Sequence, residues 1–175
     1  VRDPRGGAGA NQPWTVRYGR SGRLFSAGAS CAHGSDYLHT FDTGSQSQVG
    51  RSSGQQVCAP SLAMSADRTS LFDMESSYTP QSLGRYDVST DTPTLAGSTS
   101  DGVAGYEIAL SRDGTQVYTS GGNVGNGQVW STDFKTKLGT LADHGPNLTY
   151  SAPIDRVFIN NGHGVSEFQG SAPYN

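Results

Sequence analysis

The first candidates for a chemical role are two histidines in expected loops. His33 lies in CAHGSD and His163 in NNGHGV, and Asp36 follows His33 by three residues. Imidazole and carboxylate groups exchange protons near neutral pH and bind metals, so the three residues could form an acid–base or metal site if the two loops meet. Their spacing matches no closed zinc pattern. We therefore expect no metal, and we take these residues as catalytic only under the hypothesis that the protein is an enzyme.

The remaining candidate groups have plainer explanations. Asp73 and Glu75 alternate along an expected strand, so their carboxylates share one face, and we expect them to be solvated at the surface. We expect His39 to be packed or at the surface of a strand, and His144 to lie in a turn. The glycine-rich run at 121–127 precedes no expected helix, so it is not a phosphate cradle. No G-x-S-x-G nucleophile elbow is present, and we expect no cofactor.

Cysteine usage and one sequon bear on the location of the protein. Cys31 and Cys58 could form a disulfide, worth about 3 kcal/mol by loop-closure entropy, or remain two separate buried thiols. Asn147 begins the sequon Asn-Leu-Thr, which makes it a candidate glycosylation acceptor in a glycosylating host. Together with the many Ser, Thr and Gly residues, this sequon favours an extracellular or secreted protein.

Composition limits the partners. Only 33% of the 175 residues are hydrophobic and 15% are charged, which suits many short strands joined by turns. The net charge of −3 argues against nucleic-acid binding, which needs clustered Lys and Arg. No apolar run approaches the roughly 18 residues needed to span a bilayer. We expect a homo-oligomer, with another protein or a glycan as further candidate partners.

The elements that would position these residues recur along the chain. Apolar pairs 47, 46 and 40 residues apart are followed each time by an aromatic residue on the next expected strand. The pairs are Leu24-Phe25, Leu71-Phe72, Val117-Tyr118 and Val157-Phe158, and the aromatic residues are Phe41, Tyr86, Trp130 and Phe168. A repeat of 40 to 50 residues is typical of units that bury their faces only by stacking on one another. The pattern predicts an all-β β-propeller of about four four-stranded blades.

The repeats divide the chain into a glycine-rich N-terminal segment, 1–13, and propeller repeats, 14–175. The approximate blades are 14–59, 60–104, 105–146 and 147–175, each with strands a to d from the axis outward. The fourth blade has no candidate for strand d, and an open strand edge invites another strand. Val1, Arg2 and Asp3 could supply it, either within the chain or in a neighbouring copy. We expect deletion of residues 1–12 to abolish assembly.

Residues 60–170 resemble the YVTN or YncE-like class of bacterial β-propellers and, more loosely, WD40-like repeats. The resemblance rests on an apolar strand, a Ser-x-Asp-Gly turn, a Val-Tyr strand, a Gly and Asn loop and then x-Val-x-aromatic-x-Thr. The sequences that carry it are ALSRDGTQVYTSGGNVGNGQVWSTD, AMSADRTSLFDMESSYTPQSLGRYDVSTD and IDRVFINNGHGVSEF. The resemblance implies a propeller fold but no particular activity, since these are core and turn positions.

Members of this class usually form seven-bladed rings, whereas this chain has about four units. The ring therefore closes on its own, is shared between two chains, or belongs to a longer propeller. We expect a non-enzymatic extracellular module that acts as a structural, self-assembling or binding scaffold. The alternative is a fragment or subunit of a propeller enzyme, a hydrolase or an oxidoreductase, with its site on the face of the loops between strands b and c. Those loops carry the insertions of the repeats.

Overall fold

A computed structural model describes residues 13–28, 37–53, 56–57, 60–75, 80–122 and 125–175 of the chain. These residues form strands and turns and contain no helix, as the sequence predicts. The strands are β1 (Pro13–Tyr18), β2 (Arg23–Gly28), β3 (His39–Asp42), β4 (Ser47–Arg51), β5 (Ser61–Met64), β6 (Ser70–Glu75), β7 (Ser82–Asp87), β8 (Thr94–Thr99), β9 (Ile108–Leu110), β10 (Gln116–Thr119), β11 (Gly127–Ser131), β12 (Lys137–Leu141), β13 (Asn147–Ser151), β14 (Arg156–Asn160) and β15 (Val165–Gln169).

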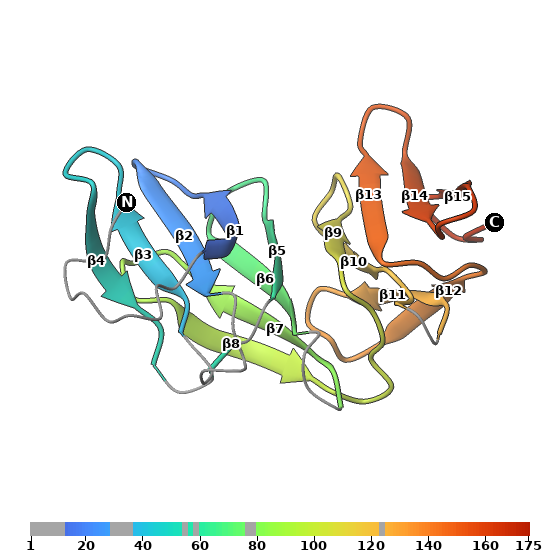
Figure 1. Cartoon of the computed structure of the whole chain (residues 1–175), viewed down its shortest axis with the longest axis horizontal. Helices are drawn as coiled ribbons and strands as arrows, with labels where there is room; N and C mark the ends of the chain where they lie inside the picture. Colours follow the sequence, from blue (N-terminus) through green and yellow to red (C-terminus); the bar gives the residue numbers. More distant parts are fainter. Residues whose placement is uncertain (1–12, 29–36, 54–55, 58–59, 76–79, 123–124) are drawn as a thin grey trace.

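The strands form four antiparallel sheets in chain order. β1 to β4, β5 to β8 and β9 to β12 make sheets of four strands, and β13 to β15 make a sheet of three. The absence of an outer strand from the fourth sheet, predicted from the sequence, is confirmed for the described residues. The first strands of the sheets contact one another in series, β1 with β5, β5 with β9 and β9 with β13. The first and fourth sheets lie at opposite ends of this series (Figure 1).

Three apolar interfaces hold the series together; we call them the first, second and third seams. The first joins sheets one and two, the second joins sheets two and three, and the third joins sheets three and four. In the apolar pairs of the sequence, the first residue faces the preceding sheet and the second faces the following sheet. Leu71 thus belongs to the first seam, whereas Phe72 and Val117 meet in the second. Both faces of a middle sheet are therefore buried, which accounts for the consecutive apolar residues.

Polar turns join the first two strands in the second and third sheets. Asp67 accepts hydrogen bonds from the Ser65 hydroxyl at 2.6 Å and the Thr69 amide at 3.0 Å. Asp113 repeats this role for Ser111 at 2.6 Å and for the Thr115 amide at 3.1 Å. Asp side chains that bind nearby amides are typical of tight turns. These two turns flank the cavity described below.

The next residue in each of these turns has a left-handed backbone. Arg68 has φ 60° and Gly114 has φ 71°. Glycine adopts this conformation without steric cost, whereas an L side chain does not. The Arg68 side chain is held by contacts with the first sheet, where it donates to the Gly19 carbonyl at 3.3 Å and lies over the Tyr18 ring.

Candidate functional site

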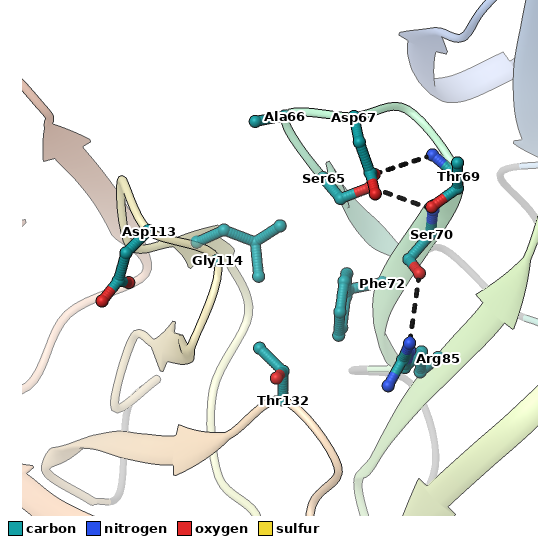
Figure 2. A pocket seen from close by; sticks show the side chains of 11 residues that line it. Ser65, Ala66, Asp67, Thr69, Ser70, Phe72, Arg85, Asp113, Gly114 and Thr132 are labelled. Atoms are coloured by element: carbon teal, nitrogen blue, oxygen red, sulfur yellow. Dashed lines mark hydrogen bonds between the residues drawn. The ribbon is translucent and has the colours of Figure 1, made fainter.

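A cavity of about 310 Å³ opens between the second and third sheets. The β5–β6 turn, strands β6 and β7, the β9–β10 turn and the residue after β11 surround it (Figure 2). The lining side chains are Ser65, Ala66, Asp67, Thr69, Ser70, Phe72, Arg85, Leu110, Asp113, Gly114 and Thr132. The site lies at the opposite strand ends from the loops between strands b and c, on which the sequence analysis placed an enzymatic site.

Arg85 supplies the positive charge of this cavity. β7 places its side chain on the face that carries Leu83, and the guanidinium carbon lies 5.9 Å from the centre of the Phe72 ring. Its Nη2 donates to the Ser70 hydroxyl over a long 3.4 Å, and its buried Nε has no hydrogen-bond partner among the residues that the structure describes. No ion pair to Arg85 is found within the described part of the chain. The Arg85 side chain thus lines the cavity with a positive charge that no carboxylate of the described residues neutralises, and such a guanidinium can bind an anion.

Two carboxylates flank the same cavity. Hydrogen bonds from the Ser65 hydroxyl and then the Thr69 amide hold the pKa of Asp67 below its ordinary value. The Ser111 hydroxyl and the Thr115 amide do the same for the pKa of Asp113. Both groups are therefore ionised at neutral pH, and they can accept hydrogen bonds from hydroxyl groups of a ligand.

A second polar group of residues is buried in the first seam. Asp73 and Glu75 lie on one face of β6, as predicted, but they are 0% and 3% exposed, so the prediction that they are surface carboxylates is wrong. Among the described residues, both side-chain oxygens of Asp73 and the Tyr86 hydroxyl have no hydrogen-bond partner. The carboxyl group occupies the space over Gly84, where a Cβ atom would collide with it. Burial, and then the charge of Glu75, raises the pKa of Asp73 to about 7.

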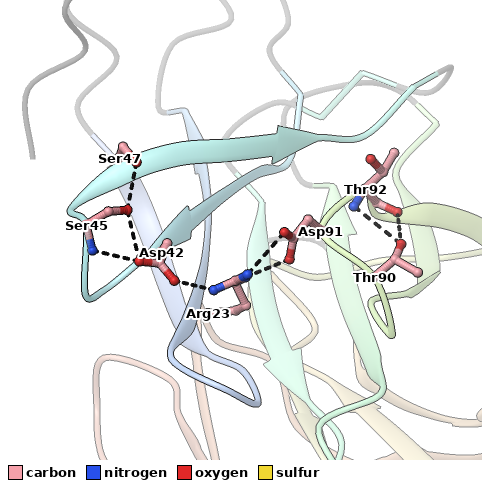
Figure 3. A network of polar contacts seen from close by, with 7 residues as sticks. All are labelled: Arg23, Asp42, Ser45, Ser47, Thr90, Asp91 and Thr92. Atoms are coloured by element: carbon pink, nitrogen blue, oxygen red, sulfur yellow. Dashed lines mark hydrogen bonds and ion pairs between the residues drawn. The ribbon is translucent and has the colours of Figure 1, made fainter.

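The rim of the first seam carries a charged network (Figure 3). Arg23 donates from Nε and Nη2 to the two oxygens of Asp91 at 2.6 and 3.1 Å, and it also pairs with Asp42. Asp42 in turn accepts hydrogen bonds from the amide and hydroxyl of Ser45. The bidentate pair joins β2 of the first sheet to the β7–β8 turn of the second. These contacts link the first two sheets, so we assign them a structural role.

Of the residues expected from the sequence to form an enzymatic site, only His163 lies in the described part of the chain. His163 is exposed in the loop between β14 and β15, where its amide donates to the Asn161 side chain at 2.9 Å. His33 and Asp36 lie outside the described residues, as do Cys31, Cys58, Val1, Arg2 and Asp3. Asn147 is exposed at the start of β13. Within the described ranges, no three His, Cys, Asp or Glu side chains are grouped so that they could hold a metal.

Sequence reasoning missed Arg85, which stands between Gly84 and Tyr86 on an expected strand. The only signal was the repeated Ser-x-Asp turn, because two of those turns flank the cavity.

The described residues also contain no helix long and apolar enough to cross a membrane.

The two ends of the series expose positions that the seams bury. At the equivalent pair positions, Leu71, Val117 and Val157 are buried, whereas Leu24 of the first sheet is only half-buried. Phe25, Phe72 and Tyr118 are buried against the following sheet, whereas Phe158 of the fourth sheet is half-buried. The strand-c aromatic residue of the first sheet, Phe41, is likewise half-buried, while those of the other three sheets are buried.

Comparison with known proteins supports the fold. No family model and no curated protein matches the sequence. The structure is similar to hydrazine synthase of Kuenenia stuttgartiensis, with a TM-score of 0.72 and 16% identity over 97% of this chain and 49% of that chain. It is also similar to a functionally unknown protein from Desulfotomaculum acetoxidans, with a TM-score of 0.64 and 14% identity over 79% of this chain and 45% of that chain. The chain thus spans about half the length of these proteins, and the likeness concerns the fold alone.

Proposed function

We propose that the chain is a non-enzymatic, extracellular β-propeller module of the YVTN-like class, a structural and binding scaffold that completes its ring with a second copy of itself. The half-buried state of Leu24, Phe41 and Phe158 carries this proposal. Their counterparts in all three seams are buried against a neighbouring sheet. An unpacked apolar face of this kind is typical of an interface.

A second copy fits these faces because it continues the existing series. The fourth sheet leaves one face free, and in each of the first three sheets the equivalent face packs against the next sheet. The free face of the first sheet is the face that the other three sheets pack against their predecessors. If the first sheet of a second copy packs on the free face of the fourth sheet, the contact repeats a seam that the chain already makes three times.

Two such contacts, each joining the fourth sheet of one copy to the first sheet of the other, close an eight-sheet ring with two-fold symmetry. The open edge of β15 would lie next to the new seam. The edge is only partly covered by the chain, since the Gln169 amide donates to the Asn175 carbonyl at 3.2 Å. A strand from the copy could add there, as proposed for Val1 to Asp3.

Substitution at the end faces tests the proposal. In light scattering coupled to size-exclusion chromatography, Phe158→Asp and Leu24→Asp should each reduce the mass to that of one chain, because a carboxylate cannot enter an apolar seam. Leu138→Asp is the matched control, since Leu138 is an exposed apolar residue of β12, away from both end faces. Circular dichroism melts should show that all three variants are folded.

Unchanged assembly of both end-face variants would overturn the proposal. Deletion of residues 1–12 tests the strand-exchange form separately. Loss of assembly in the deletion variant, with the parent chain assembled, supports an exchanged strand, whereas retained assembly rules it out.

A further inference from the structure

We propose that the cavity between the second and third sheets binds a small hydroxylated carboxylate, a sugar acid of the uronic acid type, through Arg85. The proposal does not depend on the ring assembly, because the residues involved lie in the two middle sheets, away from both end faces. It rests on the cavity itself and on the open hydrogen-bonding capacity of the arginine.

Arg85 presents a guanidinium group with few hydrogen-bond partners. A guanidinium group offers parallel N–H donors that match the two oxygens of a carboxylate. Among the described residues, Nη2 has only the Ser70 hydroxyl at 3.4 Å, and Nε has no acceptor and is closed to solvent. Asp87 is near enough for Arg85 to contribute to the lowering of its pKa, after larger effects of Ser89, but no ion pair within 4.0 Å joins Asp87 and Arg85. A ligand carboxylate would meet the outer nitrogens of this guanidinium group, which no described carboxylate neutralises.

The rest of the lining suits hydroxyl groups. Four hydroxyl-bearing side chains and two ionised carboxylates surround the space: Ser65, Thr69, Ser70, Thr132, Asp67 and Asp113. The carboxylates can accept hydrogen bonds from ligand hydroxyls, and the Ser and Thr side chains can donate or accept. The alkyl part of the lining is small, with Phe72 and Leu110 on opposite sheets.

The charges that line the cavity and its volume limit the class of ligand further. Two carboxylates against one guanidinium disfavour a multiply charged anion such as phosphate, so a single negative charge fits better. The volume of about 310 Å³ lies at the lower end of the range for small-molecule sites, which begins at about 300 Å³. A monosaccharide acid meets both conditions.

Isothermal titration calorimetry of the full chain tests this inference, with glucuronate, glucose, acetate and inorganic phosphate as probes. Glucuronate should bind, whereas glucose lacks the carboxylate and acetate lacks the hydroxyls, so each should bind roughly 10- to 100-fold more weakly. Phosphate should not compete with glucuronate. Equal binding of glucose or acetate, competition by phosphate, or no heat from glucuronate at millimolar concentration would overturn the inference.

Arg85→Gln and Arg85→Lys locate the binding. The glutamine variant should lose glucuronate affinity by roughly 10- to 100-fold, and the lysine variant should keep part of it because it retains the charge without the fork. Arg156→Gln is the control, since it removes an arginine from β14 of the fourth sheet. Melting curves should show that the Arg85 variants are folded. Full glucuronate affinity in Arg85→Gln would contradict the assignment.

Discussion

The first and third seams solve the same packing problem with different side chains at one buried position. The third seam is apolar, and its tyrosines are paired: the Tyr118 and Tyr150 rings stack at 5.3 Å, and their hydroxyls donate to the Gly170 carbonyl and to Asp155. The first seam also contains an apolar cluster, but it buries Asp73, whose side chain has no hydrogen-bond partner in the described part of the chain. Asp73 and Ile159 stand at equivalent positions, each two residues after the first residue of its apolar pair. The repeat thus fixes burial at this position but not the chemistry of the side chain.

The largest effect is expected from moving a carboxyl group into the apolar seam. Ile159 is 0% exposed, so Ile159→Asp should lower the free energy of unfolding by about 4 kcal/mol or more at pH 7, through a lost apolar side chain and a buried charge. Urea unfolding measures the change. A loss below about 1 kcal/mol would show that the third seam accepts a buried carboxyl group, as the first seam does.

The next largest effect concerns Asp73, the carboxyl group that the first seam already buries. The folded-state pKa of Asp73, about 7, lies above its ordinary value of 3.8, so the folded protein keeps a proton that the unfolded chain releases between these values. Stability should therefore fall as the pH rises from 4 to 7, by up to about 4 kcal/mol, and then level off. Urea unfolding of Asp73→Asn across this range should show a smaller fall. An identical pH profile in parent and variant would exclude Asp73 as the cause.

A matched pair of tyrosine variants compares the first and third seams through smaller changes in stability. Tyr118→Phe removes the donor to the Gly170 carbonyl and should cost about 1 kcal/mol. Tyr86→Phe removes a buried hydroxyl that has no hydrogen-bond partner within the described ranges, so it should be neutral or stabilising. Thermal unfolding of the two variants compares the seams directly. A larger loss for Tyr86→Phe than for Tyr118→Phe would contradict the hydrogen bonding described for the two seams.

The smallest effect is expected at the rim of the first seam. Arg23→Gln removes the bidentate pair with Asp91, which is partly exposed and so weakened by water and salt. The variant should melt slightly below the parent at low salt and together with it at high salt. A large difference that persists in high salt would show that this pair, and not the apolar cluster, holds the first two sheets together.

The sequence predicted the strands because their apolar pairs and turns recur, and each pair marks a sheet that is buried on both faces. The same feature explains the error at Asp73. Alternation along a strand shows that Asp73 and Glu75 share a face, but in a stacked sheet neither face is the solvent face. The Arg85 site could not be predicted, because it forms where β7 of one sheet approaches the β9–β10 turn of the next, and a single repeat contains no record of that contact.

The mass of the unmodified chain in solution tests the central claim most directly. Light scattering after size-exclusion chromatography should give twice the chain mass of 18.4 kDa, since two copies bury the free faces of the first and fourth sheets. A mass of one chain, unchanged as the protein concentration rises, would contradict the shared ring.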